Sequence, residues 1–475
     1  MITDNCQKIR DELKRDSFSA EQWEILKESI SHRTVEKLCK SNPNLLVFPH
    51  CLKNIDKDLG NQSICDIIDN KITAHNLVGF VGVRDDKSGN HVELSIRSRF
   101  QQHGNEDFFL HYMLEKAFKV HVFSMEHGKS NDDIFDFALY LFPHYLKRAI
   151  KQGLFKQYRK CEYNDANVRG AIDVTRHIRY NTPFNGRVAY RTSEYRYDNP
   201  VTQLIRHTIE YIRNSIWGKG VLSGNRDIRD AVRTIVDITP TYQATDRQRV
   251  INQNLKPVKH PFYTEYTLLQ TLCLQILQHK RIKYGRSEDK IYGILFDCSW
   301  LWEEYISTIL VEHGYIHAVR GKGKGYQFAE GLGSRYPDFY HMDGIILDTK
   351  YKRIDGREEE TEDKEYGGWG QREDQFQMIA YMHTFPGNLQ SDIKGAKLGS
   401  LIYPTSNAKA TYKHKQLYGW GGRYGTFPVH IPPIENGENY QDFCRKMEAN
   451  AASFIKELDE VRELVLRKSH PQADR

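Results

Sequence analysis

The most informative segment of the sequence is RYPDFYHMDGIILDTKYK, residues 335–352. The Asp-Gly step at 343–344 separates two apolar runs, which is a strong signal for a β-hairpin. Side chains alternate between the two faces of a strand, so Asp348 and Lys350 share one face of the second strand. Asp338 lies on the preceding strand. We therefore expect two carboxylates and an ammonium group to meet on one side of this hairpin.

These groups suit phosphodiester hydrolysis by metal-activated water. Phosphate anions repel nucleophiles, so a hard divalent cation held by carboxylates must neutralise charge and acidify a water. Asp338 and Asp348 supply the carboxylates, and the backbone carbonyl of Thr349 can add a ligand. Lys350 would position the attacking water or help to deprotonate it. The expected cofactor is Mg²⁺ or Mn²⁺.

Two flanking segments add candidate residues. A third carboxylate commonly comes from a helix packed on the sheet, and Glu303 and Glu304 in DCSWLWEEYISTIL are both candidates. Gln377 and Tyr381 are four residues apart and share a helix face, from which they can contact a phosphate or the metal-bound water. An isolated Asp-x-Lys string also occurs where a strand ends in a surface ion pair. The flanking helices favour the catalytic interpretation.

Composition and charge exclude several classes of protein. A chain of 475 residues is expected to form roughly two to four domains. The net charge of +6 does not by itself indicate nucleic-acid binding. The eight cysteines include no C-x-x-C pair, which favours a reducing, cytoplasmic location. No apolar run approaches the ~20 residues that span a bilayer, so no membrane partner is expected. Neither phosphate-binding glycine motif is present, so the chain shows no nucleotide-hydrolysis motif of its own.

The order of predicted elements indicates an α+β multidomain fold. An alternating pattern over 77–83 and 91–100 predicts a hairpin, and Asn199 with Pro200 predicts the start of a long helix. The basic segment 145–160 is interpreted as a solvated helix face or a phosphate-facing patch. Further elements are expected as helices at 21–38, 107–120, 263–279, 297–313, 374–383 and 440–466, and as a strand at 397–403. We predict an amino-terminal extension (1–75), a β-containing then largely helical region (76–285) and a carboxy-terminal α/β nuclease domain (286–475).

Several sequence blocks follow one another in the order found in a known family. They are GLFKQYRKCEYNDANVRGAIDVTRHI (153–178), EYRYDNPVTQLIRHTI (194–209), WLWEEYI (300–306), RYPDF…ILDTKYK, QMIAY (377–381) and LIYP (401–404). The chain resembles McrC, the nuclease subunit of McrBC-type modification-dependent restriction systems, over residues 75–470. The order helix, hairpin, D-x-K strand and helix resembles the PD-(D/E)xK nuclease core, and Q-x-x-x-Y resembles its RecB-like branch. Unlike most of the family, this chain has Tyr336 rather than Arg before Pro-Asp, and residues 1–70 match nothing in it.

The resemblance implies an endonuclease subunit that acts in a GTP-dependent, type IV restriction complex. Its expected partners are double-stranded DNA and a hexameric McrB-like AAA+ GTPase, which supplies the only GTP site. McrC proteins insert their amino-terminal portion into the pore of this ring and stimulate its GTPase. The Arg-rich passage 169–196 would then face the motor rather than DNA. Two alternatives stay open: a stand-alone RecB-like repair nuclease, and a non-catalytic activator of an AAA+ ring.

Overall fold

The structure is a computed structural model, and it divides the chain into two compact units. It describes residues 2–9, 18–42, 44–49, 57–85, 90–101, 107–118, 136–214, 218–223, 226–283, 291–318, 325–327, 334–354, 369–386, 395–418, 421–435 and 438–467. Unit 1 comprises Met1–Ala117, Ser124–Gly128 and Ile291–Arg475, and unit 2 comprises Phe118–Phe123 and Lys129–Lys290. Unit 2 is therefore inserted into the sequence of unit 1.

One sheet of unit 1 joins distant parts of the sequence. Its strand order is β1-β7-β6-β11-β3. β11 (Ile291–Asp297) pairs in parallel with β3 (Leu45–Phe48) and antiparallel with β6 (Leu77–Arg84). These strands come from all three predicted ranges, 1–75, 76–285 and 286–475, so the compact units divide the chain differently from the prediction.

The same sheet contains the predicted hairpin near residue 90. β6 pairs antiparallel with β7 (His91–Arg97), as expected from the alternation of apolar and polar residues. β1 (Ile2–Thr3) adds to the edge of β7 in parallel. The predicted helix at 21–38 is instead two helices, α1 (Ala20–Ser29) and α2 (Val35–Ser41). Thr34 caps the second helix, and a Ser or Thr at this position begins a new helix rather than extending the old one.

The remaining elements of the amino-terminal part of unit 1 are short. A second sheet has the order β2-β5-β4. Its strands and the neighbouring helices are β2 (Gln7–Ile9), β4 (Cys65–Ile68), β5 (Lys71–Ala74), α3 (Lys57–Asn61) and α4 (Phe108–Phe118). Trp23, Leu26, Leu45, Val81 and Leu295 belong to one buried core that both sheets share. The first 75 residues are thus packed into unit 1.

A third sheet of unit 1, with six strands, contains the predicted hairpin around Asp343 and Gly344. Its order is β12-β15-β16-β17-β19-β18, and the predicted hairpin forms from β15 and β16, with Gly344 at φ +86° in the turn. The strands are β12 (Ile316–His317), β15 (Phe339–His341), β16 (Ile345–Thr349), β17 (Leu398–Thr405), β18 (Lys413–Gln416) and β19 (Arg423–His430). A separate pair consists of β13 (Tyr326–Gln327) and β14 (Ser334–Arg335).

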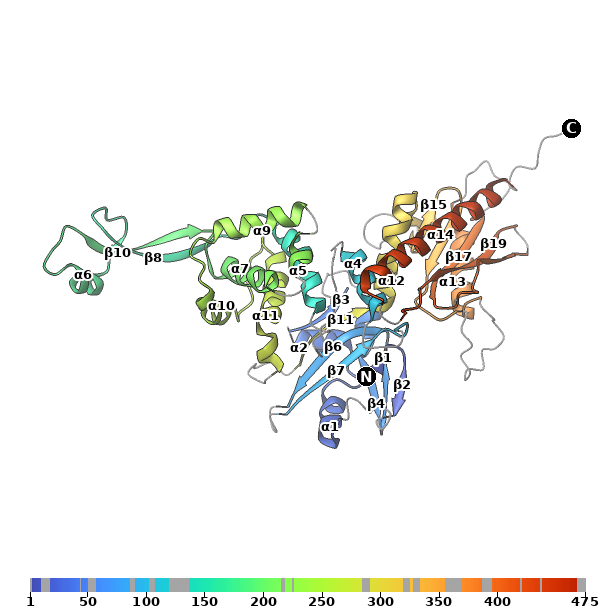
Figure 1. Ribbon diagram of the computed structural model, residues 1–475, viewed down its shortest axis with the longest axis horizontal. Coiled ribbons are helices and arrows are strands. Elements are labelled where there is room, and N and C mark those ends of the chain that lie inside the picture. Colours follow the sequence, from blue (N-terminus) through green and yellow to red (C-terminus); the bar gives the residue numbers. More distant parts are fainter. Residues whose placement is uncertain are drawn as a thin grey trace. The chain divides into compact units, whose positions relative to one another are not determined.

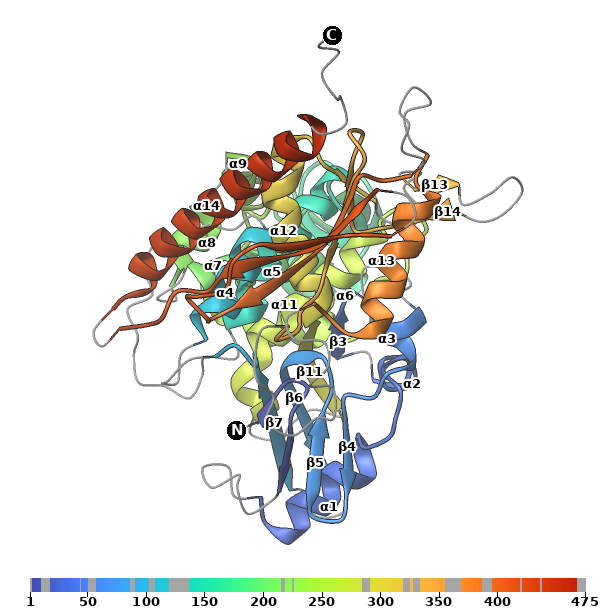
Figure 2. The ribbon, with the colours of Figure 1, turned by 90° about the vertical axis from the view of Figure 1, so that its right-hand side faces the viewer.

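Helices cover both faces of the six-stranded sheet (Figure 2). On one face, Met378 and Met382 of α13 (Arg372–Thr384) pack against Ile346 and Leu401. On the other face lie α12 (Cys298–Leu310) and α14 (Tyr440–Arg467). Because Ile346 and Asp348 alternate onto the same face, the carboxylate of Asp348 lies on the α13 side.

Unit 2 consists of a helical bundle and an arm built on the three-stranded sheet β8-β10-β9 (Figure 1). The arm pairs β8 (Gln157–Asp165) with β10 (Val188–Arg196), and α6 (Val174–Asn181) and β9 (Ala171–Ile172) lie at its far end. The bundle contains α5 (Asp136–Lys151), α7 (Pro200–Arg213), α8 (Gly218–Ser223), α9 (Arg226–Ile238), α10 (Arg247–Gln253) and α11 (Glu265–Lys283). The basic segment 145–160 is therefore the end of α5 and the start of β8, and it is not a single helix.

The molecule is a mixed α+β protein with several sheets. Among the described helices, none has the length and apolar content that a membrane crossing requires.

Candidate functional site

The hairpin of β15 and β16 brings Asp338 and Asp348 into one cavity. Asp338 directly precedes β15, and its Oδ2 accepts hydrogen bonds from the backbone N (2.7 Å) and the Oγ1 (2.5 Å) of Thr349. These bonds tie the start of one strand to the end of the other. Asp348 is the fourth residue of β16, and its side chain is 5% exposed. The two carboxylates therefore project from the adjacent ends of paired strands.

Lys350 lies between the acidic pair and helix α13. Its Nζ is 2.6 Å from Oδ2 of Asp348, and it donates a hydrogen bond of 2.9 Å to Oε1 of Gln377. The Nε2 of Gln377 in turn lies 3.3 Å from the hydroxyl of Tyr381. The predicted Gln and Tyr thus share a helix face that meets the lysine.

The structure distinguishes the two candidate glutamates by their surroundings. Glu303 borders the cavity, and its Oε1 lies 2.6 Å from Nε2 of His317 on β12. Glu304 is not among the residues that line the cavity. The order of α12 and β11 explains this placement, because Asp297 ends β11 and caps α12, which fixes the rotation of the helix.

The cavity has a volume of about 420 Å³ and contains residues that the sequence did not point to. It is lined by Asn5, Asn76, Arg99, Ser299, Glu303, Asp338, Asp348, Thr349, Lys350, Tyr351, Lys352, Gln377 and Tyr381. Behind it, Asp374 accepts from Lys352 at 3.0 Å and lies 3.7 Å from the Nζ of Lys350. The spacing of Asp374 three residues before Gln377, on the same helix face, is the signal that could have revealed it.

Burial and charge shift the pKa values of the groups in this cavity. Burial, together with the negative charges of Asp348 and Glu303, raises the pKa of Asp338 well above its usual range. Burial alone would lower the pKa of Lys350, but the charges of Asp348 and Asp338 raise it. Burial and the same two carboxylates raise the pKa of Tyr381 to about 12. The cavity therefore concentrates negative charge around a lysine that stays protonated.

The donor groups fit a hard divalent cation held by two carboxylates. Within the described ranges, no group of three or more His, Cys, Asp or Glu side chains is arranged as a metal site. Glu303, the predicted third carboxylate, lies at the same cavity and contacts His317 through Oε1. Burial and the neighbouring carboxylates raise the pKa of Asp338, so a cation bound here would favour its ionised form. Carboxylate oxygens are the ligands that Mg²⁺ and Mn²⁺ prefer, so Asp338 and Asp348 are the residues that would hold the ion.

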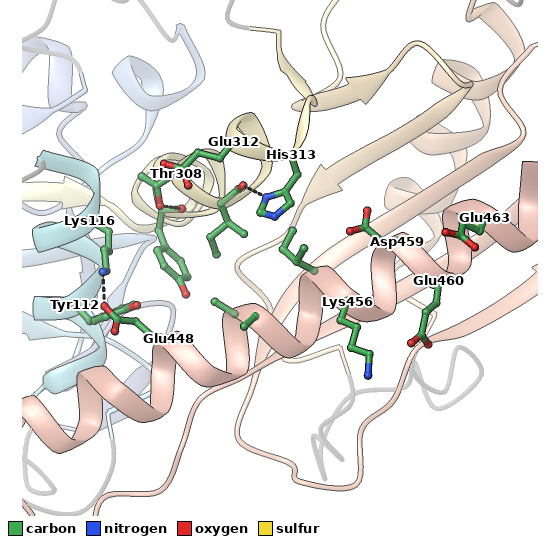
Figure 3. A pocket seen from close by; sticks show the side chains of 15 residues that line it. Tyr112, Lys116, Thr308, Glu312, His313, Glu448, Lys456, Asp459, Glu460 and Glu463 are labelled. Atoms are coloured by element: carbon green, nitrogen blue, oxygen red, sulfur yellow. Dashed lines mark hydrogen bonds and ion pairs between the residues drawn. The ribbon is translucent and has the colours of Figure 1, made fainter.

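A second hollow on unit 1 lacks this chemistry. It has a volume of about 810 Å³ and lies between α4, α12 and α14 (Figure 3). Several of its carboxylates follow one another along α14, at Glu448, Asp459, Glu460 and Glu463. A helix rises about 1.5 Å per residue, so the first and last of these are too far apart to bind one ion. The cavity around Asp338 and Asp348 is thus the better candidate for catalysis.

The arm of unit 2 exposes apolar and basic side chains together. Exposed apolar residues gather on α6 and the segments beside it, at Val168, Ile172, Val174, Ile178, Tyr180 and Phe184. Arg191 pairs with Asp173 at 2.6 Å, and the Nε of Arg169 lies 3.4 Å from the hydroxyl of Tyr190. Arg187 is exposed. Part of the predicted Arg-rich passage therefore holds the arm together, and part of it faces outward.

Comparisons with known proteins match one family model, and the similar solved structures include two assemblies. The family model "McrBC 5-methylcytosine restriction system component" matches residues 72–404, which is more than half of the chain. The refined half-complex from a tetradecameric assembly of Thermococcus gammatolerans McrB AAA+ hexamers with bound McrC is 14% identical, with a TM-score of 0.43, over 94% of this chain and 99% of that chain. The cryo-EM structure of the Thermococcus gammatolerans McrBC complex is 17% identical, with a TM-score of 0.30, over 65% and 86% of the two chains. A search of curated proteins finds no match.

Proposed function

The chain belongs to the family of McrBC 5-methylcytosine restriction system components, and from this premise we propose that it is the DNA-cleaving subunit of a GTP-dependent, modification-dependent restriction complex. The predicted resemblance to this family is confirmed. The observation that carries the proposal is the meeting of Asp338, Asp348 and Lys350 in one cavity. The carboxy-terminal part would then act as a PD-(D/E)xK nuclease domain.

The residues of the cavity have separate roles in this proposal. A divalent cation bound to Asp338 and Asp348 would supply a water of lowered pKa and neutralise charge on the scissile phosphate. Thr349 fixes Asp338 through two hydrogen bonds and thereby orients its second oxygen. Lys350 has a raised pKa, so it acts as a fixed positive charge beside the phosphate rather than as a general base. Gln377 holds the lysine, and Tyr381 holds the glutamine.

Substitution of the acidic pair and the lysine tests this function. We expect Asp338→Ala and Lys350→Ala to lower the rate of DNA cleavage by about 10²–10³-fold or more, because each removes charge that the transition state needs. Binding to the GTPase partner, measured by co-elution, should be retained. Lys413→Ala, an exposed lysine on β18 of the same sheet, is the matched control.

The result separates the proposed function from its alternatives. Cleavage at the wild-type rate by either variant would contradict the site assignment and favour a non-catalytic activator of a ring. Efficient cleavage by the purified chain with Mg²⁺ alone would instead indicate a stand-alone nuclease.

We also propose that the arm of unit 2 contacts an AAA+ GTPase ring and stimulates it. The proposal is supported by the exposed apolar side chains on and beside α6, because apolar residues gathered on a surface often mark a site of interaction. An aliphatic and aromatic surface with arginines beside it is typical of protein interfaces. GTP would bind only to the partner, which would also recognise modified DNA.

A further inference from the structure

Arg99 borders the candidate nuclease cavity although it comes from the other sheet of unit 1. It lies just after β7, and Asn5, Asn76 and Ser299 also reach the cavity from outside the six-stranded sheet. One wall of the cavity thus carries Asp338 and Asp348, and the amino-terminal part of unit 1 supplies another. A residue placed there can contact whatever lies on the acidic pair.

The guanidinium of Arg99 is held by a dedicated set of contacts. Its Nε donates to Oδ2 of Asp4 at 2.8 Å, and its backbone N donates to Oδ1 of Asp4 at 2.6 Å. Its Nη2 donates to Oδ1 of Asn76 at 2.8 Å. Its Cζ lies 5.1 Å from the ring centre of Tyr351, which directly follows Lys350 in the chain. The position of Arg99 is therefore fixed relative to the strand that carries Asp348.

These contacts leave part of the guanidinium available. Nη1 has no hydrogen-bond partner among the described residues, and the Arg99 side chain is 13% exposed. Burial alone would lower the pKa of Arg99, but the charge of Asp4 and the hydrogen bonds to it raise that pKa. The group stays positive, is rigid, and keeps donors that can point into the cavity.

The other cations of the cavity differ from Arg99. Lys350 is bound to Asp348 and Gln377, and Lys352 is bound to Gln371 and Asp374. Both lysines are compact point charges, whereas a planar guanidinium presents parallel donors that match two oxygens of one phosphate. The side chain with a fixed orientation and spare donors is therefore Arg99.

We propose that Arg99 binds a backbone phosphate of the DNA strand that is cut, and that Asp4 and Asn76 are positioning residues that aim it. This inference rests on the proposed nuclease function and names a substrate contact within the same site. It also assigns a role to the amino-terminal segment: β1 delivers Asp4, and Asp4 presets the arginine. Arg99 on one side of the cavity and the cation on the acidic pair on the other would together fix the DNA backbone before cleavage.

The decisive measurement is the salt dependence of DNA binding. The full chain with its GTPase partner, made unable to cut by Asp348→Asn, is titrated with a fluorescently labelled DNA duplex at several salt concentrations in Mg²⁺. The slope of log K against log salt is negative, and loss of one phosphate contact reduces its magnitude by about 0.9. Arg99→Gln should show this decrease and weaken binding about tenfold at low salt, and Arg99→Lys should restore the slope. Arg445→Gln, which breaks an exposed Arg–Asp pair on α14, is the control and should match the parent.

The double variant Asp4→Asn/Arg99→Gln guards against misfolding, because it removes both charges of the buried pair. It should unfold at the parent temperature and show the same reduced slope as Arg99→Gln. An unchanged slope in the folded double variant would overturn the proposal while leaving the nuclease function intact. If Lys350→Ala also cleaved normally in the otherwise wild-type chain, the proposed function itself would fail.

Discussion

Asp338 is an acid and Lys350 is a base in one cavity, and the pKa values of both are raised. For the lysine the cause is attraction by Asp348 and Asp338 that outweighs burial. For Asp338 the cause is burial next to other carboxylates. Ionisation of Asp338 beside Asp348 and Glu303 is thus unfavourable, and a bound cation would relieve it. Perturbed pKa values of this kind are common in active sites.

The raised pKa of Asp338 predicts a specific pH dependence of stability. A group whose pKa is raised on folding stabilises the folded protein below its ordinary pKa of 3.8, and this stabilisation is lost as the pH rises through the raised value. In EDTA at pH 8, well above the ordinary pKa of an aspartate, Asp338 therefore destabilises the folded protein, because the fold opposes its ionisation. Asp338→Asn keeps an acceptor for Thr349 and should raise the melting temperature by a few degrees at pH 8, with a smaller gain at pH 5.

Thermal unfolding of both proteins at the two pH values checks this prediction. Asp442→Asn, at the exposed start of α14, serves as the control and should show no such pH-dependent gain. An Asp338→Asn variant that is less stable than the wild type at pH 8 would contradict the assignment of buried charge to this site.

The sequence predicted several of the residues that line the cavity, but it did not predict those that come from another sheet. Asp338, Asp348, Lys350, Gln377 and Tyr381 follow from strand and helix periodicity, because those periods fix which side chains share a face. Arg99 and Asn76 could not be predicted, because they reach the cavity through the pairing of a different sheet. Their roles depend on tertiary packing that no local pattern records.

At the scale of elements, α7 shows how closely a local signal can fix a helix start. Asn199 is fully buried, and its Oδ1 accepts from the backbone N of Val201 and of Thr202. Its Nδ2 also donates to the carbonyl oxygens of Phe155 and Tyr197. The predicted cap at Asn199 and the proline at the first turn are confirmed. The side chain thus joins the start of α7 to the segments on either side of the arm.

Removal of this cap should destabilise the bundle of unit 2. We expect Asn199→Ala to cost about 2 kcal/mol or more, because it deletes the cap and leaves buried carbonyls without a donor. Asn199→Asp keeps the acceptor that caps α7, so it should lower the stability less than Asn199→Ala does. Hydrogen exchange of the α7 amides measures the effect locally. Equal protection in wild type and Asn199→Ala would show that the cap carries little of the stability.

The boundaries of elements were predicted less well where capping or pairing intervened. The segment 145–160 reads as one basic helix, but α5 ends at Lys151 and β8 begins at Gln157, where the chain pairs with β10. The pairing partner lies some thirty residues later, and helical periodicity cannot detect it. The pairing of β11 with β3, which lie far apart in the sequence, also explains why the bounds of the two compact units could not be predicted from the order of the sequence motifs.

At the scale of the whole molecule, the site and the arm lie in separate compact units. Variants of the two should therefore affect different activities. We expect Ile178→Asp and Phe184→Asp, which place charge on the exposed apolar surface of the arm, to lower stimulation of the partner GTPase at least tenfold. Asp338→Ala should leave that stimulation unchanged.

The control for the arm is Leu255→Asp, which charges an exposed apolar residue of unit 2 that lies outside the arm. A GTPase assay with each variant at matched concentration gives the result. Normal stimulation by Ile178→Asp and Phe184→Asp would remove the arm from the proposed interface. The Arg187→Glu variant extends the test to the outward-facing arginines, since it breaks no ion pair within the described residues.

The pairing of β3 with β11 has a consequence for biosynthesis. Leu45 must pair with Gly293, so the ribosome completes the whole inserted unit before the first sheet can close. Until then β6 has an open edge on the side that β11 will occupy, and open edges invite association between chains. The newly made protein should therefore depend on chaperones or on slow translation through the insertion, and its yield should respond to both.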